Sequence, residues 1–379
     1  MDAATSAWST PADDRPPDHV NQVAVALTDE LRQSFFTVGQ WERLESLAEV
    51  RSLPTPLDFN TSAARAVLAS AEVLLTGWSC PPLSEDVLDS CPHLRAIIHT
   101  GGSVRAFVGP EVFRRGIQVS SQTDLNAEPV AQFCLAQILL AAKGVARATR
   151  RYAATKSLDT FHLSDDAVDE TPDRDSAARL AEDGPASTRL DQSTIGAWKA
   201  TVGLIGYGRV CHHLIGLLRA FPVRILLNSP YVNPAQAEDL GVELTTPEQI
   251  MSDADVISIH LGDTPDNHAA INADLLSLIK PGATFINTAR GIVVDEPALI
   301  HELTTGRFDA ILDVTWPETP APDSRLWTLP NVTLTPHWAG SLGRELTRLG
   351  QGVIDNLEQY LAGQPMTGQV PPELAAYIA

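Results

Sequence analysis

Residues 201–211 read TVGLIGYGRVC, and this stretch decides the fold. An apolar, β-branched run leads directly into Gly206 and Gly208, and a helix-length segment comes next. Gly206 permits a tight turn, and Gly208 lets the backbone approach a pyrophosphate at the N-terminus of the next helix. A G-x-G pair alone occurs in many loops, but this one lies between a predicted strand and a predicted helix. The stretch therefore predicts a dinucleotide site in a βα unit.

Strand-like runs extend in both directions from this turn. From residue 200 to residue 337 they are TVGLIG, VRILLN, VISIH, ATFINT, AILDV and VTLT, separated by helix-length segments. This alternation is typical of a doubly wound parallel sheet. Four further apolar runs, bounded by Pro, Gly or Asp, predict strands of another parallel sheet nearer the N-terminus. They are QVAVAL (22–27), EVLLTGW (72–78), RAIIHTG (95–101) and IQVSS (117–121).

Three connecting segments complete the organisation. The run EPVAQFCLAQILLAAKGVARATR predicts a helix capped by Asn126, with Pro129 in its first turn, buried between layers. Residues 155–194 are acidic and lack a clear period, so we expect a mobile surface insertion rather than a structured lid. The stretch SLGRELTRLGQGVIDNLEQYLAG predicts one amphipathic helix that packs back onto the first domain.

Composition excludes several classes of protein. The formal net charge of -20 would repel nucleic acid, so no nucleic-acid partner is expected. No run of about 18 uninterrupted apolar residues is present, and none is expected to span a membrane. The first twenty residues lack a basic start and an apolar stretch, which predicts a cytoplasmic protein without a secretory signal. The four cysteines form no C-x-x-C pair and have no histidine at zinc spacing, so we expect buried free thiols and no metal site.

Three later segments each place a polar residue just beyond a predicted strand, where doubly wound sheets bind ligands. These residues are Arg290, Glu318 and His337. An arginine fork can hold a carboxylate through two hydrogen bonds, and a histidine beside a carboxylate can exchange a proton near neutral pH. Each residue alone has a structural explanation, as a surface ion-pair partner or a strand-end histidine. Their joint occurrence beside a dinucleotide site indicates catalysis.

The cofactor determinants depart from the usual pattern at two positions. Cys211 replaces the third glycine, so the helix is expected to lie slightly further from the strand. Ser229 stands where an acid usually binds the adenosine ribose, and no arginine comes after it. The cofactor is therefore expected to be NAD or NADP, with NAD slightly favoured.

The order and spacing of these motifs resemble the D-isomer-specific 2-hydroxyacid dehydrogenase family over nearly the whole chain. The motifs are GLIGYGR, TARG with VVDE, LDV-x-x-x-E and TPHWAG. The resemblance implies an NAD(P)-dependent D-2-hydroxyacid dehydrogenase in which Arg290 binds the substrate carboxylate and polarises the carbonyl, His337 is the acid/base, and Glu318 pairs with His337. It implies two Rossmann-like domains with the active site in the cleft between them, and a homodimer formed through the cofactor domain.

The resemblance also implies domain limits and contact residues. Residues 1–125, completed by 341–379, would form the substrate-binding domain, and residues 126–340 would form the dinucleotide-binding domain. Backbone N–H groups of Gly101, Gly102 and Ser103 in the substrate loop would reach the substrate carboxylate, together with Arg290. Independently of the resemblance, Trp78, His99 and Trp338 are candidates for lining the substrate pocket. The family pattern is also broken at Gly262 and Asp263. Cofactor contacts are expected at Gly206, Gly208, Arg209, Val210, Ser229, Thr288, Ala289, Arg290, Asp313, His337 and Gly340.

Two other functions fit the same motifs. A dehydrogenase of this fold that acts on another small oxyanion, such as phosphite, would use Arg290 and His337 equally well. A non-catalytic scaffold that binds NADH, as co-repressors of the family do, would not need an intact Arg–Glu–His set. The proton-transfer pair thus favours an enzyme.

Overall fold

The computed structural model describes residues 21–78, 80–156 and 195–372. Its contacts divide the chain into two compact units, one of residues 1–126 and 342–379 and one of residues 127–341. Apart from residues 155 and 156, the expected mobile insertion lies outside the described residues. Each unit has a parallel sheet of its own.

Unit 1 is built on a five-stranded parallel sheet in the order β2-β1-β3-β4-β5. Apolar residues alternate between its two faces, so one core cluster contains Ala24 and Ile97 while the opposite cluster contains Val23 and Ile98. The sheet is therefore buried on both sides. Its strands and helices are β1 (Gln22–Ala26), α1 (Asp29–Phe35), α2 (Val38–Leu47), β2 (Glu49–Ser52), α3 (Ser62–Leu68), β3 (Val73–Thr76), α4 (Glu85–Asp89), β4 (Ala96–His99), α5 (Pro110–Arg114), β5 (Gln118–Ser121) and α14 (Leu346–Leu361).

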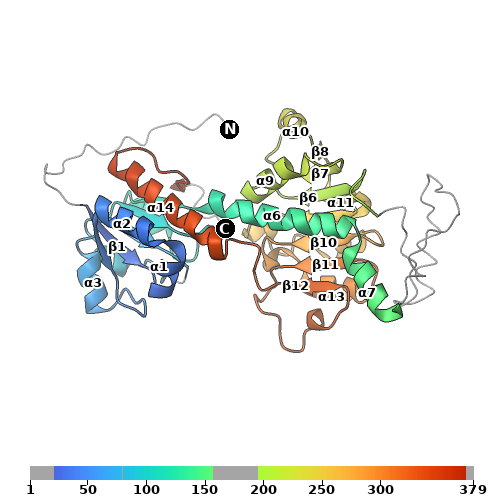
Figure 1. Cartoon of the computed structure of the whole chain (residues 1–379), viewed down its shortest axis with the longest axis horizontal. Coiled ribbons are helices and arrows are strands. Elements are labelled where there is room, and N and C mark those ends of the chain that lie inside the picture. Colours follow the sequence, from blue (N-terminus) through green and yellow to red (C-terminus); the bar gives the residue numbers. More distant parts are fainter. Residues whose placement is uncertain (1–20, 79, 157–194, 373–379) are drawn as a thin grey trace. The chain divides into compact units, whose positions relative to one another are not determined.

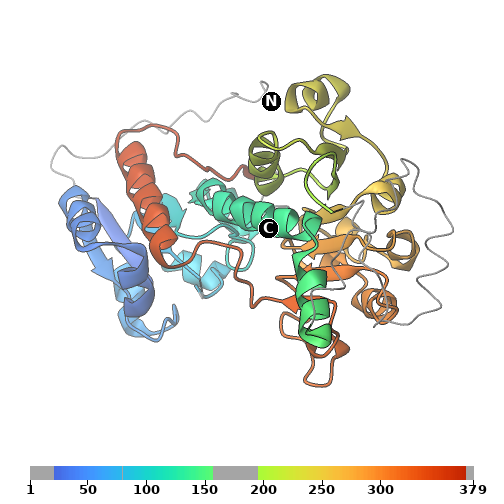
Figure 2. The same ribbon diagram turned by 45° about the vertical axis from the view of Figure 1, so that its right-hand side comes forward.

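The C-terminal helix α14 belongs to unit 1 and lies against α1 and α2, as Figures 1 and 2 show. Leu349, Val353 and Leu357 are buried in the same cluster as β1 and β3. This confirms the predicted amphipathic helix and its packing. Threonine N-caps begin the first helices of this unit: the side chain of Thr28 accepts a hydrogen bond from Leu31 N, and Thr37 forms a capping box. Caps of this kind stabilise a helix by about 1 kcal/mol each.

Unit 2 is built on a seven-stranded parallel sheet in the order β12-β11-β10-β9-β6-β7-β8. The strand order reverses at β6, which pairs with β7 on one side and β9 on the other. The six strands predicted from the sequence are confirmed. The strands are β6 (Thr201–Ile205), β7 (Arg224–Asn228), β8 (Glu243–Leu244), β9 (Val256–Ile259), β10 (Thr284–Asn287), β11 (Asp309–Leu312) and β12 (Val332–Leu334).

Helices cover both faces of this sheet. Residues of α6 and α9 share a core cluster with Val202 and Leu204, and residues of α11, α12 and α13 share the opposite cluster with Ile205 and Ile257. The helices are α6 (Thr123–Ala142), whose residues 123–126 belong to unit 1, α7 (Val145–Thr155), α9 (Arg209–Leu218), α10 (Pro234–Leu240), α11 (Pro247–Asp253), α12 (Ala273–Ser277) and α13 (Glu296–Leu303), with 3-10 turns at Pro265–Asn267, Gly291–Val293 and Arg325–Trp327.

Helix α6 differs from the prediction in three ways. It begins at Thr123, so Asn126 is inside the helix rather than its cap, and Pro129 is an interior residue. It ends near Gly144, whose φ of 66° is left-handed, and α7 continues the chain as a separate helix (Figure 2). Its burial is also one-sided, because Leu140 is half-exposed. The pattern of apolar residues alone did not locate the break at Gly144.

By length and composition, α6 is the one helix of the described residues that could cross a membrane. A core helix of a soluble protein meets the same criterion. In this structure Val130, Ala131, Cys134 and Ile138 of α6 are buried in the core of unit 2.

Candidate active site and cofactor site

The three residues predicted to be catalytic come after three neighbouring strands of unit 2. Arg290 lies beyond the end of β10, Glu318 beyond β11 and His337 beyond β12. Because β10, β11 and β12 are adjacent and parallel, their carboxyl ends meet at one edge of the sheet. The topology thus brings the three segments to one place, although they are separated along the chain.

His337 and Glu318 form a close pair. Nδ1 of His337 lies 2.6 Å from Oε1 of Glu318, and their side chains are 51% and 60% exposed. An ion pair this exposed contributes only about 0–1 kcal/mol to stability. The pair is therefore suited to orienting the ring, since a partner at Nδ1 leaves Nε2 for a ligand.

Asp313 holds the turn that carries His337. The backbone of His337 has a φ of 54°, in the left-handed region. The buried carboxylate of Asp313 accepts hydrogen bonds from Trp338 N at 2.7 Å, from Ala339 N at 3.0 Å and from the hydroxyl of Thr335. The carbonyl of Asp313 also accepts from His337 N at 3.0 Å. The structure therefore shows Asp313, expected to contact the cofactor, as the anchor of the histidine turn.

A short turn after β10 presents Arg290. Asn287 Nδ2 donates to the carbonyl of Arg290 at 2.9 Å, and Asn287 Oδ1 accepts from Ala289 N at 3.0 Å. Gly291 comes next, in close contact with the neighbouring loop, because a Cβ there would lie 2.0 Å from the carbonyl carbon of Thr315. Glycine at 291 thus allows the arginine segment and the loop that carries Glu318 to pack directly together.

Glu296 was not identified from the sequence. Its Oε2 accepts a hydrogen bond from Trp316 N at 3.0 Å, two residues before Glu318. Burial raises the pKa of the Glu296 carboxyl, and the Trp316 N–H opposes that rise. The hydroxyl of Thr315 donates to the carbonyls of Pro317 and Glu318, at 2.8 and 3.0 Å. Helix α13 therefore fixes the Glu318 loop through Glu296, the last residue of the VVDE motif, to which the sequence alone assigns no role.

The turn between β6 and α9 has the geometry that a dinucleotide requires. Gly206 has a φ of +96°, and a Cβ there would lie 2.5 Å from the carbonyl oxygen of His260. A Cβ on Gly208 would meet nothing within 4 Å, so the space before the helix is open. Gly208 is the N-cap of α9 and supplies no side-chain hydrogen bond, which leaves the first-turn N–H groups for an anion. The residues present therefore fit a pyrophosphate at the strand-order reversal.

Cys211, which replaces the third glycine, lies in the helix–sheet interface of unit 2. It is fully buried in the core cluster of α6 and α9, and burial raises the pKa of its thiol. The thiol of Cys134 lies 3.1 Å from the hydroxyl of Thr288, and its pKa is raised to about 11 by burial. All four cysteines are buried and free, as predicted. Within the described residues, no group of three or more His, Cys, Asp or Glu side chains is placed to hold a metal ion.

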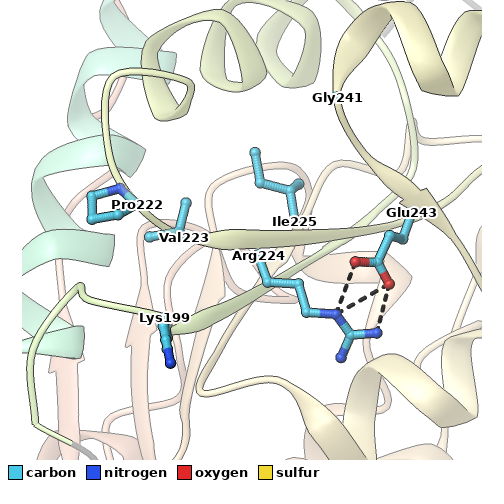
Figure 3. A pocket seen from close by; sticks show the side chains of 7 residues that line it. All are labelled: Lys199, Pro222, Val223, Arg224, Ile225, Gly241 and Glu243. Carbon is cyan, nitrogen blue, oxygen red and sulfur yellow. Dashed lines mark hydrogen bonds and ion pairs between the residues drawn. The ribbon is translucent and has the colours of Figure 1, made fainter.

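Ser229 lies just beyond the end of β7, as predicted, and its Oγ accepts a hydrogen bond from Tyr231 N at 3.1 Å. Arg224 lies at the other end of the strand, where its guanidinium pairs with Glu243 at 2.6 Å (Figure 3). The surface hollow beside this ion pair, of about 440 Å³, is at the amino edge of the sheet and so is remote from the turn that fits a dinucleotide. Its lining residues are Lys199, Pro222, Val223, Arg224, Ile225, Gly241 and Glu243.

The other expected cofactor residues of unit 2 lie at the same carboxyl edge. Arg209 and Val210 open α9, Thr288 and Ala289 lie between β10 and Arg290, and Gly340 lies just after the histidine turn. Thr288 is buried, Val210 and Ala289 are partly buried against the core, and Arg209 is exposed.

The expected substrate loop, Gly101–Ser103, lies just after β4 in unit 1. The carbonyl of Gly101 accepts from Gln122 N at 2.8 Å, and that of Gly102 accepts from Thr123 Oγ1 at 2.9 Å. A Cβ on Gly101 would lie 2.6 Å from Trp78 Nε1 and 2.8 Å from His99 Nε2. Only glycine fits between these two rings, so the backbone at 101 is held close to both.

Comparisons with known proteins agree with this geometry. Residues 176–339 match the model of the NAD-binding domain of D-isomer-specific 2-hydroxyacid dehydrogenases. A D-3-phosphoglycerate dehydrogenase of Mycobacterium tuberculosis is 30% identical over 300 residues, which are 79% of this chain and 51% of that protein. A glyoxylate reductase of Korarchaeum cryptofilum is 27% identical over 77% of this chain and 79% of its own length.

Solved structures show the same fold. D-mandelate dehydrogenase of Rhodotorula graminis superposes with a TM-score of 0.73 at 18% identity, covering 93% of this chain and 98% of that one. The chain spans about half the length of the mycobacterial phosphoglycerate dehydrogenases that it matches. By these matches, residues 176–339 are similar to the NAD-binding domain of D-isomer-specific 2-hydroxyacid dehydrogenases, and the chain resembles named dehydrogenases over most of its length.

Proposed function

We propose that this protein is an NAD(P)-dependent D-2-hydroxyacid dehydrogenase, which interconverts a 2-keto acid and the corresponding D-2-hydroxy acid. The observation that supports this most strongly is the 2.6 Å contact between His337 Nδ1 and Glu318 Oε1, at the sheet edge where Arg290 also lies. A proton donor, its orienting carboxylate and a carboxylate-binding arginine are what the reduction of a 2-keto acid requires.

Each residue has a distinct role in this proposal. His337 donates a proton to the substrate carbonyl oxygen during reduction, and accepts it from the hydroxyl during oxidation. Glu318 holds the ring by Nδ1, so that Nε2 faces the substrate. Arg290 binds the substrate carboxylate through its planar fork and polarises the adjacent carbonyl. The nicotinamide supplies or accepts the hydride when it is bound.

The two units have separate roles in this proposal. Residues 126–340 form the cofactor domain, in which Gly206, Gly208 and the N-terminus of α9 receive the pyrophosphate. Residues 1–125, completed by 341–379, form the substrate domain, and the loop Gly101–Ser103 reaches the substrate carboxylate through backbone N–H groups. NADH is slightly preferred over NADPH. By the family likeness, we expect a homodimer, and by its composition and net charge of -20 we expect a cytoplasmic protein without nucleic-acid or membrane partners.

A substrate panel tests this function. Oxidation of NADH and NADPH would be monitored with glyoxylate, hydroxypyruvate, pyruvate, and branched and aryl 2-keto acids. The expected result is turnover of at least one 2-keto acid and formation of the D-isomer, identified by chiral chromatography. Turnover of phosphite with NAD⁺ alone would replace the proposal by an oxyanion dehydrogenase, and tight NADH binding without any turnover would indicate a scaffold.

A further inference from the structure

Two tryptophans flank the proton-transfer pair. Trp338 directly follows His337 and is 58% exposed, and Trp316 precedes Glu318 by two residues and is 60% exposed. Leaving a side chain of this size in water forgoes much of the free energy that its burial would provide. Two such side chains beside one histidine–carboxylate pair indicate a surface that a ligand covers.

The positions of both tryptophans are fixed. Trp316 N donates to Glu296 Oε2 at 3.0 Å, and Trp338 N donates to Asp313 Oδ1 at 2.7 Å. These are the same carboxylates that hold the Glu318 loop and the His337 turn. Because β11 and β12 are adjacent, Trp316 and Trp338 both lie at the edge of the sheet that carries the catalytic candidates. The backbones that carry the two rings are therefore held by the same carboxylates as the reacting groups.

Other exposed tryptophans in unit 2 occupy different environments. Trp198 precedes β6 and so lies at the amino edge of the sheet, away from the catalytic candidates. Trp327 is tied to its own loop, since its Nε1–H donates to the carbonyl of Ala321 at 3.0 Å. Among the described residues, the indole N–H groups of Trp316 and Trp338 have no such partner. Both rings are thus available to a ligand.

Building on the proposed function, we infer that Trp316 and Trp338 select 2-keto acids with a bulky aromatic side chain. Arg290 would hold the carboxylate and His337 would face the carbonyl oxygen, so the remaining substituent of the keto acid is left for the flanking rings. Stacked or edge-to-face aromatic pairs are worth about 0.5–1.5 kcal/mol beyond the area that they bury. A substrate with an anionic side chain would find no cation at these positions, because both tryptophan rings are neutral.

The test compares phenylpyruvate with pyruvate, which share the reacting carbonyl and carboxylate. In the wild type, kcat/KM for phenylpyruvate is expected to exceed that for pyruvate by about tenfold or more. Trp316→Leu and Trp338→Leu each lower kcat/KM for phenylpyruvate by about threefold to tenfold, and change that for pyruvate less than about twofold. Trp198→Leu is the matched control and changes neither. Calorimetric binding of D-phenyllactate and D-lactate to the same four proteins provides a second readout.

The outcomes separate this inference from the function on which it rests. Preference for pyruvate or glyoxylate in the wild type, or tryptophan variants with an unchanged ratio, would overturn the aromatic specificity while the dehydrogenase remains. Absence of turnover with every 2-keto acid would overturn both. Both side chains are more than half exposed and both anchoring hydrogen bonds use backbone N–H groups, so the leucine variants are expected to fold.

Discussion

The two sheets of this protein each present a histidine at their carboxyl edge, in opposite environments. His99 ends β4 of unit 1, is 1% exposed, and its Nδ1 lies 3.0 Å from Thr76 Oγ1. Burial lowers the pKa of His99 to about 3, so its ring is neutral at physiological pH. His337 of unit 2 is half-exposed, and its Nδ1 lies 2.6 Å from the carboxylate of Glu318. The same fold thus uses one strand-end histidine as a packed neutral group and the other as a candidate proton donor.

This difference teaches that a strand-end position does not make a histidine catalytic. A proton donor must reach its substrate, and of these two histidines only His337 is exposed enough to do so. His99 Nε2 has no hydrogen-bond partner among the described residues and faces the backbone of Gly101 instead. Substitutions at the two histidines should therefore have different consequences, one for turnover and the other for stability.

The largest effect is expected from His337→Ala, which should lower kcat by about 10²–10⁴-fold because a positioned acid is lost. Cofactor binding, measured by NADH fluorescence, should stay within about twofold, since the Gly206–Gly208 turn is unchanged. His301→Ala, which replaces an exposed histidine on α13, is the control and should retain full activity. Wild-type kcat in the His337 variant would show that the contrast between the two histidines has no bearing on the reaction.

Arg290→Lys should raise KM and lower kcat together. Lysine keeps the charge but lacks the planar fork, so one of two charge-assisted hydrogen bonds to the carboxylate is lost. A bond of that kind is worth about 1.5–3 kcal/mol, which corresponds to a loss of about tenfold to a hundredfold in kcat/KM. Steady-state kinetics at saturating cofactor measures it. If only the affinity for the cofactor changed, Arg290 would belong to the nucleotide site.

Several of these residues could be predicted from the sequence for a simple physical reason. Strands buried on both faces must be continuous apolar runs, and parallel strands bring the residues just beyond their carboxyl ends to one edge of the sheet. The runs before Arg290, Glu318 and His337 therefore predict both the sheet and the site. The edge strands β2 and β8 were missed, since each is short and its residues are partly or fully exposed. Exposed residues carry no apolar periodicity.

The supporting interactions could not be predicted from the sequence. Glu296 acts on the Glu318 loop through the backbone N–H of Trp316, and Asp313 binds two backbone N–H groups of the histidine turn. Every residue except proline can donate a hydrogen bond from its backbone N–H, so the identity of the donor does not reveal such a bond. The start of α6 was misplaced for a related reason, because Asn126 is a good N-cap residue that the structure uses inside the helix.

The neutral state of His99 should make unit 1 sensitive to acid. Its pKa is depressed to about 3 in the folded state, against an ordinary value of about 6.5 when unfolded, so the unfolded state binds more protons between these values. Stability is therefore fully present above about pH 6.5 and falls as the pH is lowered through that value, by about 2 kcal/mol at pH 5.

Urea unfolding of the wild type and of His99→Gln at pH 7.5 and pH 5.0 measures this contribution. The variant should lose about 2 kcal/mol less than the wild type between the two pH values, or about thirtyfold in the unfolding equilibrium. Comparing the pH dependence rather than stability at one pH removes the cost of the substitution itself. Equal losses in both proteins would mean that His99 is charged in the folded state, and the contrast with His337 would disappear.

The smallest effect is expected at Ser229, a candidate cofactor contact in unit 2. Ser229 accepts a hydrogen bond from Tyr231 N and carries no charge, so it neither repels a 2′-phosphate nor binds two ribose hydroxyls strongly. Arg224 cannot supply the missing charge, because it pairs with Glu243 at the opposite end of β7. The wild type should therefore discriminate only weakly between the two cofactors, with a slightly higher kcat/KM for NADH.

Ser229→Asp should raise the ratio of kcat/KM for NADH to that for NADPH by about tenfold, chiefly by weakening the binding of NADPH. Strong selectivity of the wild type for one cofactor, or an unchanged ratio in the variant, would mean that another residue binds the ribose and determines the cofactor preference.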